Sequence, residues 1–172
     1  MSKRLLVYAM TVSLLVLGCV PPLATFTNDM YEGNQQLTQG QYSTALATFL
    51  KANTYHPSAG AYAFAAMAAY KMNDITLADN YLVQATQGLT PNQVVTCIIY
   101  GYRSLVRFSQ GNDPAGRDEL TAYIAAYRNV VPGSATLREV EFMAMAPQVD
   151  TFVLQKLIDQ QIQQLPIDYD QM

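Results

Sequence analysis

The feature that most constrains the fold of this 172-residue chain is an internal repeat with a period of 33 residues, which relates segment 40–52 to segment 73–85. The equivalent pairs are Gly40 and Asn73, Tyr42 and Ile75, Ala45 and Ala78, Phe49 and Leu82, and Ala52 and Ala85. Periods of about 20–50 residues are typical of stacked supersecondary units, each of which buries its apolar face against the next. The repeat therefore predicts a stack of similar units.

Each unit has the pattern of two antiparallel helices joined by a tight turn. Small residues at Gly33 and Ala45 allow the two helices to approach closely. An apolar stripe follows the second helix at Tyr42, Phe49 and Ala52, with the spacing that buries one helical face. Gly40 and Asn73 suit the left-handed backbone that ends a first helix, and Pro57 ends the first unit.

These residues resemble the tetratricopeptide repeat, a helix-turn-helix unit of about 34 residues. The positions that match the family pattern are Gly33, Gly40, Tyr42, Ala45, Phe49, Ala52 and Pro57. Asp29 stands where the family has an aromatic residue, and Tyr70 lies one place from the corresponding aromatic of the second unit. The resemblance implies an all-α, superhelical stack of antiparallel helix pairs.

A third, irregular unit follows. Gly111, Gly116 and Leu120 repeat the pattern of Gly40, Ala45 and Phe49 at an offset of 71 (40 to 111), whereas Gly101 matches Gly33 at an offset of 68 (33 to 101). An insertion of three residues in the turn 109–114 would reconcile the two offsets. Asp113 and Pro114 provide an N-cap and a first helical position for the next helix.

Two further helices are expected at 135–146 and 149–165. The last carries an apolar stripe, with amides and Asp159 around the rest, and we interpret it as a cap with a polar outer face. The stripe consists of Val149, Phe152, Val153, Leu157 and Ile162. The predicted fold is thus an all-α stack of about three helix pairs plus a C-terminal capping helix, with no period-two pattern that would indicate a sheet.

The N-terminus has the pattern of a secretory signal. Lys3 and Arg4 precede the apolar run 5–17, which is shorter than the ~20 residues that span a bilayer. The ending Val-Leu-Gly-Cys at 16–19 resembles the lipobox of bacterial lipoproteins. This resemblance implies cleavage after residue 18, a covalent lipid on Cys19 and, because Val20 is not acidic, sorting to the outer membrane. An ordinary secretory signal or an uncleaved anchor is the alternative.

The predicted organisation is a signal peptide at 1–18, a lipidated tether at 19–27, a helical domain at 28–165 and a loose acidic tail at 166–172. Without Lys3 and Arg4, eight of the ten basic residues remain against thirteen acidic ones, a net charge of −5. That balance, with no basic cluster, argues against nucleic acid or anionic lipid as a partner. Membrane attachment would depend on the acyl chains alone.

Few residues could support chemistry. His56, the only histidine, has no Cys, Asp or Glu at ligand spacing, so we expect an exposed loop residue and no metal site. Glu139 and Glu141 are two positions apart on a helix and therefore point in different directions. Cys97 lies in an apolar stretch and is expected to be a buried, inert thiol. The sequence predicts a protein that is not an enzyme and has no cofactor other than the lipid.

In the tetratricopeptide family, the first helices line a concave groove that binds peptides. By that resemblance the groove would be lined by Asn34, Leu37, Met67, Tyr70, Lys71, Tyr102 and Leu105. Most of the twelve tyrosines are expected to pack in the core. The layout is similar to that of pilotin-like lipoproteins, which implies a tethered adaptor for a protein partner in assembly of a secretion system, a pilus or an outer-membrane machine. A structural subunit of an envelope complex and a small-molecule or cell-wall binding protein are the alternatives.

Overall fold

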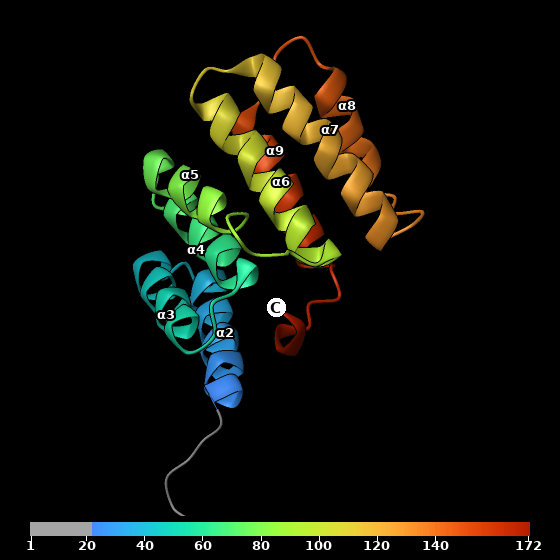
Figure 1. Ribbon diagram of the computed structural model, residues 1–172. Coiled ribbons are helices and arrows are strands. Elements are labelled where there is room, and N and C mark those ends of the chain that lie inside the picture. The colour runs from blue at the N-terminus through green and yellow to red at the C-terminus, as the bar shows by residue number, and fades with distance from the viewer. Residues whose placement is uncertain (1–21) are drawn as a thin grey trace, which may run out of the picture.

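A computed structural model of the protein describes residues 22–172 (Figure 1). The predicted signal peptide and Cys19 lie outside the described residues. Residues 22–172 form eight α-helices and one 3-10 helix, without a strand. The elements are α2 (Pro22–Thr38), α3 (Tyr42–Tyr55), α4 (Ala59–Lys71), α5 (Ile75–Gln84), α6 (Gln93–Ser109), α7 (Asp113–Val130), α8 (Leu137–Met145), α9 (Thr151–Ile162) and η1 (Tyr169–Gln171).

The helices pack in adjacent pairs, which confirms the predicted all-α stack. Helices α2, α4 and α6 form one layer, since α4 contacts both of the others, and α3, α5 and α7 each pack on their own partner (Figure 1). α4 lies at the centre and is buried on every side, which its many alanines permit because a small side chain lets neighbouring helices approach. We call the side of α2, α4 and α6 on which α9 and η1 lie the inner face.

Three tight turns repeat the same geometry. Gly40, Asn73 and Gly111 have positive φ angles of 77°, 63° and 73°, which confirms the left-handed conformation predicted for the first two. Each turn is closed by a main-chain hydrogen bond to a carbonyl five residues earlier. The bonds, of 2.9, 3.0 and 2.9 Å, join Gln41 to Gln36, Asp74 to Ala69 and Asn112 to Arg107.

The third pair differs from its prediction in one respect. The turn at Gly111 has the same length as the turn at Gly40, so the expected insertion at 109–114 is wrong. At the offset of 71 set by this turn, the small residue equivalent to Gly33 is Ser104, which is fully buried. The additional residues lie in the connection 85–92 before α6, compared with 56–58 before α4. Asn112, one residue before the expected position, caps α7.

The first helix begins earlier than expected, because residues 22–27 of the predicted tether are already helical. Pro22 starts α2, where a missing amide hydrogen costs nothing. Phe26 is fully buried, which fixes this first turn to the domain. Asp29, at the position where the repeat family has an aromatic residue, is buried and accepts a 3.0 Å hydrogen bond from Lys51 of α3.

Helix α9 is rotated relative to the prediction. Its buried side consists of Leu154, Ile158, Gln161 and Ile162, whereas Phe152 and Val153 are 64% and 41% exposed. The stripe predicted through these two residues is therefore wrong. The cause is the surface beneath: buried tyrosine hydroxyls of α6 and α7 require acceptors, and Tyr123 donates to Oε1 of Gln161 at 2.6 Å.

The tail was expected to be loose, and that expectation is also wrong. Residues 169–171 form η1, which lies beside α2 (Figure 1). Tyr169 is only 4% exposed. Burial of this one aromatic ring attaches the acidic segment to the core. The charges of the segment alone do not predict this.

Candidate functional site

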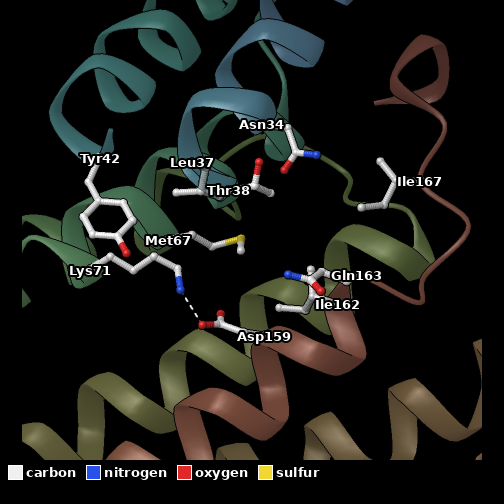
Figure 2. A pocket seen from close by; sticks show the side chains of 10 residues that line it. All are labelled: Asn34, Leu37, Thr38, Tyr42, Met67, Lys71, Asp159, Ile162, Gln163 and Ile167. Carbon is white, nitrogen blue, oxygen red and sulfur yellow. Dashed lines mark hydrogen bonds and ion pairs between the residues drawn. The ribbon is translucent and has the colours of Figure 1, made fainter. Parts of the chain in front are cut away.

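The inner face contains a cavity of about 260 Å³ between the first helix pairs and α9, which we call the inner cavity (Figure 2). Helices α2, α3 and α4 form one wall, and α9 with the following segment forms the other. The lining residues are Asn34, Leu37, Thr38, Tyr42, Met67, Lys71, Asp159, Ile162, Gln163 and Ile167. Apolar side chains thus alternate with amides, hydroxyls and one ion pair.

The ion pair joins Lys71 of α4 to Asp159 of α9 across the cavity (Figure 2). The two side chains are 13% and 22% exposed, so each neutralises a charge that burial would otherwise penalise. Tyr102 of α6 donates a second hydrogen bond to the same carboxylate. Burial raises the pKa of Tyr102 well above its ordinary value, which keeps the proton on this donor.

Tyr42 completes this cluster, since the Lys71 ammonium lies 6.0 Å from the centre of its ring, at the limit of a cation–π contact. Tyr42 and Lys71 also border a second cavity of about 330 Å³. This second cavity is lined by Tyr42, Tyr70, Lys71, Asn73, Ser109, Thr151, Phe152 and Gln155. The Tyr42–Lys71–Asp159 cluster therefore divides the space between the repeats and α9 into two adjacent compartments.

The structure brings five of the seven predicted groove residues to these cavities. Asn34, Leu37, Met67 and Lys71 line the inner cavity, and Tyr70 joins Lys71 in the second. The hydroxyl of Tyr70 is 3.0 Å from that of Ser109. Tyr102 and Leu105 are fully buried beneath α9, so neither side chain is accessible to a partner in this conformation.

The residues that the sequence analysis did not identify come from the other wall: Asp159, Ile162, Gln163 and Ile167. In a repeat stack the last helix is expected to cover the end, and here it covers part of the inner face. The signal that could have located it is chemical. Tyr102 on a first helix needs an acceptor when it is buried, and Asp159 of α9 supplies one.

The other chemistry-bearing residues are placed apart from these cavities. Cys97 is fully buried, as predicted, and burial raises the pKa of its thiol to about 11. His56 is exposed and lies edge-on to Phe26, with ring centres 5.3 Å apart. Glu141 pairs with Arg128 at 2.7 Å, away from Glu139. Within residues 22–172, no group of His, Cys, Asp or Glu is arranged to hold a metal ion.

A separate apolar cleft lies between α8 and α9. Its volume is about 320 Å³, and its lining consists of Arg138, Glu139, Phe142, Met143, Val153 and Leu157. Beside it, Phe142 and Met145 are 70% and 77% exposed. The terminal helix pair therefore has an outward-facing apolar surface.

These features define an all-α stack of helix pairs with an amphipathic cavity on its inner face. Comparison with family models, with curated proteins and with solved structures finds no significant match to this chain. Among residues 22–172, every helix is too short or too polar to cross a bilayer.

Proposed function

We propose that the protein is a membrane-tethered, non-enzymatic adaptor that binds a short segment of a protein partner in the cell envelope through the inner cavity. The observation that supports this most is the chemistry of the cavity wall. The one ion pair is internally neutralised, and Asn34, Thr38 and Gln163 offer uncharged donors and acceptors among apolar side chains. A peptide presents the same combination of amide groups and apolar side chains.

Tethering would come from Cys19, by acylation of its thiol and of the amine released by cleavage. Two or three acyl chains hold a protein on a membrane durably, since each buried methylene contributes about 0.8 kcal/mol. Outer-membrane localisation follows from the residue after the cysteine. Incorporation of labelled palmitate into the full chain, and its loss in Cys19→Ala, would test this anchor.

The adaptor proposal is tested by site-specific photo-crosslinking in the native membrane. A photoreactive residue at Thr38, which is exposed at the rim of the inner cavity, should capture one discrete partner. Val83, 41% exposed on α5, provides the control position. Gln163→Ala should weaken capture from position 38, whereas Gln160→Ala, also exposed on α9 but not part of the lining, should leave it unchanged. Equal capture at 38 and 83 would contradict the proposal.

The second candidate is a structural subunit of a large envelope complex, and the α8–α9 surface favours it. Exposed apolar residues that gather in one place mark contact sites. Phe142 and Val153 line the α8–α9 cleft while 70% and 41% exposed, and Met145 of α8 is 77% exposed. A crosslinker at Met145 that captures a neighbour, with none captured from Thr38, would favour the structural role. Stabilisation by a small molecule without any crosslink would instead favour the small-molecule or cell-wall binding alternative.

A further inference from the structure

The segment 166–172, which we call the strap, crosses from the end of α9 back to the first two helix pairs. It contributes Ile167 to the wall of the inner cavity. Beyond Ile167 it contacts α2, α4 and the start of α6, so that the last and first parts of the described chain meet. The strap therefore borders the cavity that we propose as the binding site of a partner's segment.

Tyr169 is the anchor of the strap. Its ring packs edge-on to Tyr31 of α2, with centres 4.5 Å apart, and against Phe64 of α4 at 6.0 Å. Burial raises the pKa of this tyrosine to about 12. Tyr31 itself remains 60% exposed, so the aromatic slot is open to solvent along one side.

Three further contacts fix the direction of the strap. Thr27 donates a 2.7 Å hydrogen bond to Oδ1 of Asp170, and the amide of Asn92 donates to the main-chain carbonyl of Gln171 at 3.2 Å. Met172 lies over Gly60 of α4. A Cβ atom at Gly60 would stand 2.7 Å from the sulfur and 2.9 Å from the Cβ of Met172, so the absence of a side chain there makes room for the methionine.

The strap is held weakly compared with the helices it covers. Of its seven residues only Tyr169 is buried, and the others are exposed or partly exposed. Its only regular structure is the short 3-10 helix η1. Segments with one buried side chain and solvent-exposed hydrogen bonds belong to the parts of a protein that open most readily. The surface beneath it combines the buried Gly60 and Phe64 of α4 with the partly buried Thr27 and the exposed Tyr31 of α2.

We propose that this surface is a binding site for a short peptide segment with an aromatic residue followed by an acidic one, and that the strap is its intramolecular occupant. The partner's aromatic ring takes the slot between Tyr31 and Phe64, its carboxylate accepts from Thr27, and a long flexible side chain lies over Gly60. Displacing the strap also removes Ile167 from the inner cavity and joins the two sites. The inference rests on the proposed adaptor function, because it names the chemistry of the segment that the adaptor binds.

The test uses the strap's own sequence as the probe. A fluorescein-labelled peptide, Pro-Ile-Asp-Tyr-Asp-Gln-Met, is titrated with the full chain, and anisotropy reports binding. In the wild-type protein the tethered strap competes at an effective concentration on the order of millimolar. Tyr169→Ala frees the slot and should therefore bind the peptide about tenfold more tightly than wild type.

Two controls make the result specific. A peptide with alanine in place of tyrosine should not bind, and Tyr31→Ala in the Tyr169→Ala background should reduce affinity at least about fivefold, on the scale of an aromatic contact. Tyr55→Ala, which removes a 43% exposed tyrosine elsewhere, should have no effect. Should Tyr169→Ala fold poorly by circular dichroism, the variant Asp170→Ala/Met172→Ala loosens the strap through its exposed contacts and should also gain affinity.

Equal affinity of wild-type and loosened proteins for the peptide, or equal binding of the alanine peptide, would overturn the proposal. The outcome is separable from that of the adaptor function. If the peptide binds but no partner is crosslinked from Thr38, the proposed peptide-binding surface is supported and the adaptor function is contradicted. A discrete crosslinked partner together with a peptide that does not bind would keep the adaptor and reject this site.

Discussion

The first two helix pairs and the terminal helix α9 differ in how many polar side chains they turn toward the core. In α2–α5 the buried positions other than Asp29 are apolar or small, and Gly33 faces the ring of Phe49 so closely that an added Cβ would lie 2.5 Å from it. In α9 the polar Asp159 and Gln161 face inward beside three buried apolar side chains, whereas Phe152 is 64% exposed. The comparison shows that the kind of side chain that a helix buries in this protein depends on the surface it packs against.

The reason lies in the helices that each region covers. Helices α3 and α5 pack on surfaces of Ala, Gly, Phe and Met, where shape is the main constraint. Helix α9 packs on Tyr102, Tyr123 and Tyr127, whose hydroxyl groups would each leave an unsatisfied donor in the core. Acceptor groups on the inward side of α9 are therefore needed at this end of the stack.

The sharpest way to break this comparison is to truncate one phenylalanine from each region. Phe49→Ala removes a fully buried ring beside Gly33 and should lower the free energy of unfolding by about 3–5 kcal/mol. Phe152→Ala removes a ring that is 64% exposed and should change it by less than about 0.5 kcal/mol. Chemical denaturation of both variants measures the difference, and similar losses would refute the orientation of α9.

The next largest effect concerns two ion pairs that differ in burial. Asp159→Ala leaves Lys71 largely buried and Tyr102 without its acceptor, so we expect a loss of about 2–4 kcal/mol. Glu141→Ala breaks the pair with Arg128, whose side chain is 60% exposed, and should cost at most about 1 kcal/mol. Denaturant midpoints compare the two, and Asp159→Asn would show how much depends on charge alone.

The repeat region could be predicted from the sequence because its determinants are local. Gly40 and Asn73 indicate their turns by backbone preference, and the apolar stripe through Phe49 has a single helical solution. The orientation of α9 could not be predicted in this way. The apolar stripe through Phe152 and Val153 has a normal helical period, so the sequence alone favours burial of that side. The side with Gln161 is buried instead, because it offers acceptors to tyrosines of helices that are distant in sequence.

The candidate site divides in the same manner. The wall formed by Asn34, Leu37, Met67 and Lys71 is what the resemblance to the tetratricopeptide repeat implies, because the first helices of that family line its groove. The opposite wall depends on where the chain returns after α8, a non-local property. Tyr169 illustrates the limit: one aromatic residue within an acidic segment carries no periodic signal, although its burial closes the site.

A smaller effect is expected from the hydroxyl groups themselves. Tyr123→Phe preserves the ring but leaves Oε1 of Gln161 without its 2.6 Å donor in a buried environment. We expect a loss of about 1–2 kcal/mol in the free energy of unfolding. Tyr55→Phe, on a 43% exposed side chain, should change it by less than about 0.5 kcal/mol. If Tyr123→Phe left the free energy of unfolding unchanged, the burial of Gln161 would have another cause.

The smallest expected effect is a difference in pH dependence between the strap and the helices that it covers. Burial raises the pKa of Tyr169 from 10.0 to about 12, so the docked strap favours the protonated phenol. The stabilisation is complete below pH 10 and is lost as the pH rises toward 12, because the released tyrosine ionises more easily. We expect amide hydrogen exchange in residues 166–172, corrected for the intrinsic pH dependence of exchange, to accelerate over this interval before exchange in α4 does. Tyr169→Phe, which cannot ionise, should remove the early phase, and its persistence there would assign the transition to another group.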